Sequence, residues 1–272
     1  MFSFATKALA ASLVVGVAGP AFAADPYSAP AEPVAPQVIY QGDVADYSGW
    51  YIRGDVDYHW SDFRGASYTT YVPPSSNDFD FGNFDDGWSL GGGVGYQITR
   101  HLRTDLTADW LFKSDFTGQT SDGVNVSVDT SAYSALLLLA NAYVDIGTWY
   151  GVTPYVGAGI GGAWVEWDDL NNTLDDGTAS RHRGGSDWRF AYALSAGASY
   201  CLTQQLKFDA GYRFSHIQGG KMFEFAAGTA GPGYDDGIYA HEVRGGLRYQ
   251  FGKSDCSVPE TIAYEPLPVY TK

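Results

Sequence analysis

Several residue types are scarce in this chain of 272 residues, and each scarcity excludes a class of protein. Lysine and arginine number 16 against 31 aspartates and glutamates, and the net charge of −15 argues against nucleic acid as a partner. Charged residues are only 17% while aromatic residues reach 16%, which excludes a disordered chain. After residue 23 the longest compact apolar run is Ala135–Ala140, too short for a transmembrane helix. What remains is a chain rich in aromatics and glycine, a composition that favours strands and tight turns.

The N-terminus has the three parts of a secretory signal. Lys7 supplies the positive charge, residues 8–17 form the apolar stretch, and Ala21-Phe22-Ala23 is a small-x-small cleavage site. We therefore expect a signal peptide at residues 1–23 and a mature chain that begins outside the cytoplasm. Because Ala24, and not a cysteine, directly follows the cleavage site, the sequence does not predict a lipoprotein.

From Trp50 onward apolar and polar residues alternate, which is the period of a β-strand with two different faces. In the first such segment the apolar face begins with Trp50 and ends with Trp60, while charged residues occupy the other face. Two later segments alternate less clearly because Leu136–Leu139 and a glycine–alanine run blur the period. The eight expected strands lie near residues 50–60, 88–98, 102–112, 133–145, 155–167, 190–200, 206–215 and 241–251.

The connections between these segments are alternately long and short. The long ones lie near residues 61–87, 114–131, 168–187 and 217–238. This alternation, with an even number of strands, is typical of outer-membrane barrels whose short turns face the periplasm. The predicted fold is all-β: an eight-stranded antiparallel transmembrane up-and-down β-barrel with four long external loops. The expected parts are the signal peptide, a Pro-rich periplasmic linker at 24–47, the barrel at 48–251 and a periplasmic C-terminal tail at 252–272.

A soluble sandwich or a lipocalin-like barrel is the alternative, and it would bury the apolar face. We disfavour it because tryptophans stand at the ends of that face, as in the aromatic girdles of membrane barrels.

The polar faces of the expected strands carry charges of both signs in nearly equal number. The positive residues are Arg53, Arg103, Lys113, Arg189, Lys207, Arg213, Arg244 and Arg248, and the negative ones are Asp55, Asp57, Asp105, Asp109, Asp209 and Glu242. Eight strands enclose a space that side chains can fill, and buried charges are tolerated when they are paired. We therefore expect an interior filled by ion pairs and no open channel.

The long connections hold much of the excess negative charge. Their acidic residues are Asp78, Asp80, Asp85, Asp86, Asp168, Asp169, Asp175, Asp176, Asp235 and Asp236. Divalent cations, shared with lipopolysaccharide phosphates, are one interpretation. Simple solvation of exposed loops is the interpretation we favour, because the sequence contains no Ca²⁺-binding loop motif.

The last expected strand resembles the assembly signal of outer-membrane barrels, a polar-x-Gly-x-x-aromatic-x-aromatic pattern. Its matching residues are Arg244, Gly246, Tyr249 and Phe251. Together with Asn141–Asp145 and Thr153–Gly161, the chain from about Ser48 to Phe251 resembles the porin-family surface antigens of alphaproteobacteria. It departs from them by continuing from Gly252 to Lys272.

The resemblance implies an abundant protein of the cell outer membrane that supports envelope integrity and meets the host or the environment. The partners it implies are outer-membrane lipids, lipopolysaccharide, the barrel assembly machinery and a host or environmental surface ligand. Some relatives bind heme, so a heme binder or a narrow-pore transporter is the first alternative. We expect no resident cofactor.

An outer-membrane lipid enzyme is the second alternative, because Arg213–Gln218 resembles a strand of lipid A deacylases. Gln218 stands where their nucleophilic serine would be, and Ser215 points away from His216. His59 and Ser61 have the required spacing but face inward. We therefore predict neither a catalytic nor a metal site.

The weak candidate for heme binding is His182 between Arg181 and Arg183 in an outer loop, with the histidine as iron ligand and the arginines on the propionates. Basic residues that offset nearby aspartates are the simpler interpretation.

Cys201 and Cys256 both lie at expected periplasmic ends, in an oxidising compartment where they can form a disulfide. One strand separates their positions, and residues 252–255 can span the difference. Two free thiols are the alternative.

Overall fold

The computed structural model describes residues 48–71, 73–121, 125–226, 230–252 and 254–256. The expected signal peptide and linker, and the tail from residue 257, lie outside the described residues. Every regular element in the described part is a β-strand. These described residues form no helix that is long and apolar enough to cross a membrane.

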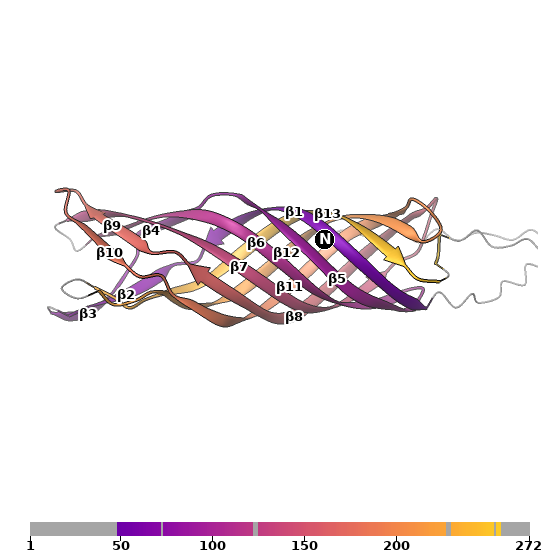
Figure 1. Ribbon diagram of the computed structural model, residues 1–272, viewed down its shortest axis with the longest axis horizontal. Coiled ribbons are helices and arrows are strands. Elements are labelled where there is room, and N and C mark those ends of the chain that lie inside the picture. Colours follow the sequence, from indigo (N-terminus) through magenta and orange to yellow (C-terminus); the bar gives the residue numbers. More distant parts are fainter. Residues whose placement is uncertain (1–47, 72, 122–124, 227–229, 253, 257–272) are drawn as a thin grey trace, which may run out of the picture. The chain divides into compact units, whose positions relative to one another are not determined.

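Eight long strands form a closed ring, and the prediction of an eight-stranded antiparallel barrel is confirmed (Figure 1). Their order around the ring is β7, β8, β11, β12, β13, β1, β5 and β6, and β6 pairs with β7 to complete it. Their bounds are β1 Gly49–Phe63, β5 Gly87–Thr99, β6 Leu102–Ser121, β7 Val126–Asp145, β8 Val152–Trp167, β11 Ser186–Cys201, β12 Leu206–Phe223 and β13 Gly233–Gln250.

The two faces of the barrel follow the alternation of the sequence. Outward-facing Trp50, Ile52 and Leu106 are 60%, 50% and 62% exposed, whereas inward-facing Asp57 and Asp109 are fully buried. A barrel in water would bury the apolar set, so this distribution is the one expected in a bilayer.

The segments expected to be long loops are largely strands. β6 continues to Ser121 and β7 begins at Val126, and the two remain paired to these ends. Twenty residues at ~3.4 Å each, tilted by ~40°, reach roughly 50 Å along the barrel axis, about twice the ~25 Å apolar band of such barrels. Alternation in the sequence marked only the part of each strand with an apolar outer face. The paired parts beyond it have mostly polar outer faces and were predicted to be loops.

Five short strands extend the barrel at the same end (Figure 1). They are β2 Ala66–Tyr71, β3 Pro74–Asp78, β4 Phe81–Phe84, β9 Leu170–Leu174 and β10 Ala179–His182. β4 pairs with β6, β9 joins β7 to β10, and β2 joins β13 to β3. We call this projecting part, with the distal ends of β6, β7, β12 and β13, the crown.

A β-bulge in β6 corrects the expected position of Lys113. The register shifts between Leu111 and Ser114, so that two residues of β6 lie opposite one residue of β7. Lys113 therefore points outward with its side chain 62% exposed, and its Nζ lies 2.7 Å from Asp168 Oδ2. The prediction that Lys113 faces the interior was wrong because strict alternation does not anticipate a bulge.

A large apolar cluster lies in the part of the interior nearest the crown. Leu111, Phe116, Leu137, Trp167 and Ile238 are each at most 3% exposed, and Phe63, Phe79 and Phe84 pack in the same cluster. At this level both faces of β7 and β8 are apolar, which is why their segments alternated less clearly. Each large apolar side chain buried here stabilises the fold by roughly 1.5–3 kcal/mol.

Candidate functional site

The barrel interior contains two levels of charged side chains below the apolar cluster. In the level nearest the short turns, Arg103 Nε donates to Asp145 at 3.1 Å, and its guanidinium lies over the Tyr143 ring at 4.0 Å. Arg248 Nε donates to Asp209 at 3.0 Å, and its Nη2 donates to Ser199 at 2.8 Å. Each arginine is thus held by a carboxylate and a second group.

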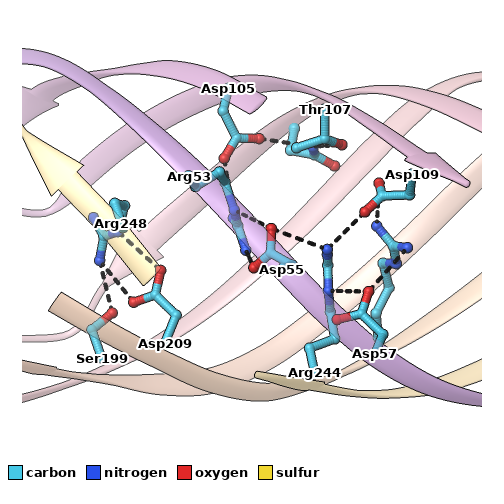
Figure 2. Close-up of polar contacts among 12 residues, drawn as sticks. Arg53, Asp55, Asp57, Asp105, Thr107, Asp109, Ser199, Asp209, Arg244 and Arg248 are labelled. Atoms are coloured by element: carbon cyan, nitrogen blue, oxygen red, sulfur yellow. Dashed lines mark hydrogen bonds and ion pairs between the residues drawn. The ribbon is translucent and has the colours of Figure 1, made fainter. Parts of the chain in front are cut away.

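The second level joins strands on different sides of the ring. Arg53 donates to Asp55 at 2.7 Å and to Asp105 at 3.2 Å. Arg244 lies 3.1 Å from Asp57 and 2.9 Å from Asp109, as Figure 2 shows.

Arg213 completes this level. It donates to Asp109 at 2.8 Å and is also paired with Glu242, and all three side chains are buried. Asp109 on β6 is therefore shared by arginines from β12 and β13, which are not its neighbours in the sheet.

Sequence reasoning missed some members of this interior. Asp145 has the same parity along β7 as Asn141 and Tyr143, so its inward position could have been found from the pattern. Asn141 Nδ2 donates to Asp105 at 2.8 Å. Asp235 was placed among the exposed loop acids, but it is 3% exposed and accepts from Arg189 at 2.7 and 2.8 Å. That placement was wrong because β13 begins at Gly233 and turns Asp235 inward.

A short segment after β13 closes over the end of the barrel opposite the crown. Cys201 and Cys256 are joined by a disulfide with a Cα–Cα distance of 5.7 Å. Between β13 and this bond, Asp255 pairs with Lys207 and accepts from Thr153 at 3.2 Å. Ser254 donates to the carbonyl of Gln204 in the turn before β12. We call residues 254–256 the latch.

Asp255 is an ionised anchor in this latch. Burial opposes its charge, but the Lys207 ammonium and hydrogen bonds from Lys207, Thr148 and Thr153 hold the pKa of its carboxyl below the ordinary value. The latch therefore fastens the β7–β8 turn, β8 and β12 to one carboxylate.

The three residues considered for heme do not converge. They alternate along and just after β10, so His182 is buried at 4% exposure while Arg181 and Arg183 are exposed. The His182 ring packs on Phe223 at 5.0 Å, and Arg181 pairs with Asp169 at 2.7 Å. Among the described residues, no group of three or more His, Cys, Asp or Glu is arranged to hold a metal ion.

The residues considered for catalysis also lie apart. Ser215 is buried inside, whereas His216 packs outward against Tyr192 and Tyr239 at ring distances of 5.1 and 4.9 Å. His59 Nε2 does lie 3.2 Å from Ser114 Oγ, a pair that spacing in the sequence did not suggest. Both residues have zero exposure inside the barrel.

The crown has a polar groove on its outer surface, which we call the outer groove. Its volume is about 790 Å³. It is lined by residues of β6, β7, β8, β9, β10 and β11 and of the connections between strands, among them Asp85, Asp115, Glu166, Asp168, Asp169, Arg181 and Arg183.

Comparison with protein families decides the class of this barrel. The family described as "Outer membrane protein beta-barrel domain" matches residues 9–251. The chain belongs to this family. It is a β-barrel protein of the cell outer membrane, and its exposed apolar belt faces lipid.

Proteins similar in sequence include one from Brucella and one from Rickettsia. An uncharacterized protein of Brucella abortus is 37% identical over 243 residues, which covers 75% of this chain and 85% of the relative. A Rickettsia conorii protein, named as a candidate adhesin, is 30% identical over 173 residues, which covers 60% of this chain and 66% of that one.

Two solved outer-membrane barrels align with most of this one. Neisserial surface protein A has a TM-score of 0.38 and 18% identity, covering 75% of this chain and 99% of that chain. Outer membrane protein OprG of Pseudomonas aeruginosa has a TM-score of 0.45 and 15% identity, covering 75% and 97%.

The residues of the expected assembly signal lie along the end of β13 away from the crown. Tyr249 and Phe251 are 37% and 50% exposed and face lipid, with ring centroids 5.1 Å apart. Arg244 belongs to the buried ion pairs. Gly246 lies opposite Asp55, and a Cβ atom added there would lie 2.2 Å from Asp55 Oδ1, so only glycine fits.

Proposed function

We propose that this outer-membrane barrel is a closed, non-conducting protein that supports the envelope and presents its crown to the outside for surface interaction. The observation that supports closure is the series of side-chain layers that fill the interior. The latch, the two levels of ion pairs and the aromatic cluster follow one another along the barrel axis. An ion that entered would have to break buried pairs and then cross apolar side chains, and both steps are costly.

The orientation in this proposal follows from the two ends of the barrel. The short turns and the latch are at one end and the crown is at the other, and in barrels of this kind the longer connections face outward. The crown would then stand among lipopolysaccharide molecules, with a strongly acidic surface. The adhesin name of the Rickettsia relative is in keeping with a role in contact.

No enzymatic activity is part of the proposal, and absence of catalysis stays a prediction. The assembly-signal role of Arg244, Gly246, Tyr249 and Phe251 is likewise proposed, on the basis of their pattern and their place on the last strand.

Bilayer recording tests closure directly. The refolded mature protein should insert without steady single-channel steps, because side chains fill the interior. The control is the variant R53A/R244A, which removes two central guanidinium groups and should increase leak if it inserts. A large, stable conductance in the unaltered protein would refute the closed barrel.

A further inference from the structure

The outer groove lies just beyond the lipid-facing belt. On β6 the outward aromatics Trp110 and Phe112 are followed by Lys113 and Asp115, and on β8 the outward Trp164 is followed by Glu166. Aromatic residues of this kind mark the interface of the bilayer with water. The groove therefore opens to solvent above the membrane, where a water-soluble partner has access to it.

The groove is acidic, and the Lys113 ammonium beside it, paired with Asp168, also attracts Glu166 and Asp115 at longer range. Five carboxylates line it against two guanidinium groups. Asp168 is paired with Lys113, and Asp169 with Arg181, at 2.7 Å each. Within the described residues, no ion pair engages the carboxylates of Asp85, Asp115 and Glu166.

The wall of the groove is fixed by the backbone. Asp168 N–H donates to the carbonyl of Ala132 at 2.8 Å, and Ser131 Oγ donates to the carbonyl of Asp168 at 2.9 Å. Gly184 N–H donates to Asp169 Oδ1 at 2.9 Å, and this bond together with Arg181 holds the pKa of that carboxyl below its ordinary value. Asp169 is thus held in its ionised form, and the backbone of Asp168 and its neighbours is fixed to β7.

The chemistry of the lining discriminates among occupants. A phosphate headgroup would meet five carboxylates, and the described residues are not arranged to hold a bare metal ion. The polar wall offers little to an apolar ligand. Cationic side chains do fit this lining. Lys113 and Arg181 of the chain itself each form an ion pair with a groove carboxylate.

We propose that the outer groove binds a short, extended, basic peptide segment of a partner protein, whose lysine or arginine side chains pair with Asp85, Asp115 and Glu166. The volume of about 790 Å³ is that of a site for a short segment. Thr117, Thr130 and Asn171 line the same groove and supply hydrogen bonds to a peptide backbone. This inference rests on the proposed surface-interaction function and names the partner's chemistry.

The test is calorimetric titration of the full mature protein in detergent micelles. The probe is a capped hexapeptide of alternating lysine and serine, and its twin with glutamate in place of lysine is the peptide control. The basic peptide should bind and the acidic twin should not. Binding of both peptides, or of neither, would overturn the inference.

Two double variants with the same change of charge separate the groove from general electrostatics. D115N/E166Q removes two groove carboxylates, whereas D78N/D80N removes two exposed crown carboxylates outside it. The groove variant should weaken peptide binding by about tenfold, since two charge-assisted pairs are lost, and the control by less than about twofold. Equal weakening would mean attraction to overall charge and would overturn the site.

A divalent cation and a phosphate are also titrated. Displacement of the peptide by 1 mM CaCl₂ at constant ionic strength, or direct binding of inorganic phosphate, would assign the groove to another ligand and overturn the proposal. The two proposals fail separately. A conducting barrel refutes the closed interior, whereas a closed barrel that ignores the peptide refutes only the peptide site.

Discussion

At the scale of single residues, the second level of the interior depends on three arginines, Arg53, Arg213 and Arg244, that each pair with more than one carboxylate. Arg244 approaches Asp57, Asp109 and Asp55 at 3.1, 2.9 and 3.5 Å. The alternation of the sequence predicted most of the charged residues that face inward, but it misplaced Lys113 and missed Asp145 and Asp235. It could not predict partners, because Asp109 and Arg244 lie on strands that are not neighbours and meet only across the closed ring.

The first prediction concerns Arg244→Ala. Removal of this guanidinium leaves Asp57 and Asp109 buried without one of their partners, so the free energy of unfolding should fall by about 3–5 kcal/mol. Denaturant titration in detergent, followed by tryptophan fluorescence, measures it. The control is Arg181→Ala, which removes an exposed pair and should cost less than about 1 kcal/mol.

A double variant guards against a trivial loss of folding. Arg244→Ala with Asp57→Asn removes one of the stranded charges and should recover part of the lost stability. Equal stability of Arg244→Ala and the unaltered protein would show that the level of ion pairs does not support the fold.

At the scale of elements, glycine lets β8 lie close to β7. A Cβ added at Gly161 would lie 1.9 Å from the carbonyl oxygen of Leu138. One residue further, a Cβ at Gly162 would find nothing nearer than 3.4 Å, at the carbonyl of Arg189. These glycines made the alternation of the sequence less clear. Gly161, which faces inward, is required because β7 and β8 approach each other closely at this position.

The second prediction compares these neighbours. Gly161→Ala must push β7 and β8 apart and should lower the free energy of unfolding by about 1–3 kcal/mol. Gly162→Ala, on the lipid face, should change it by less than about 0.5 kcal/mol. Chemical denaturation of both variants in the same detergent measures the difference. Equal effects would contradict the close approach as the cause.

The sequence predicted some elements of the fold and not others. Strand existence, order and number followed from periodicity, because a barrel wall needs one apolar and one polar face. The bulge at Phe112–Lys113 and the crown strands did not follow, because neither has that two-faced pattern. The aromatic cluster of the crown was missed for the same reason, since Phe63, Phe79 and Phe84 come from segments predicted to be loops.

At the scale of the whole molecule, the latch connects the last part of the described chain to strands that precede it. The disulfide joins residues 55 positions apart and brings Asp255 to Lys207. The cysteine count and the compartment predicted the bond as one of two alternatives. The role of Asp255 did not follow from the sequence, because no pattern marks an isolated acid after the last strand.

The third prediction concerns this bond. Cys201→Ser should lower the free energy of unfolding by roughly 2–4 kcal/mol, because the cross-link restricts the unfolded chain. Unfolding with and without reductant measures the effect, and the variant should be insensitive to reductant. Thiol labelling of the denatured, unreduced protein is the independent check. Two reactive cysteines per chain would rule the bond out.

The paired strands of the crown determine what an antibody can recognise. Its surface is assembled from segments far apart in the chain, as where Tyr234 pairs with Ser67 and Thr130 with Asn171. Epitopes built from such neighbours are discontinuous and exist only while the strands are paired. Antibodies raised against linear peptides from the crown segments would therefore recognise little of the surface that the folded protein displays.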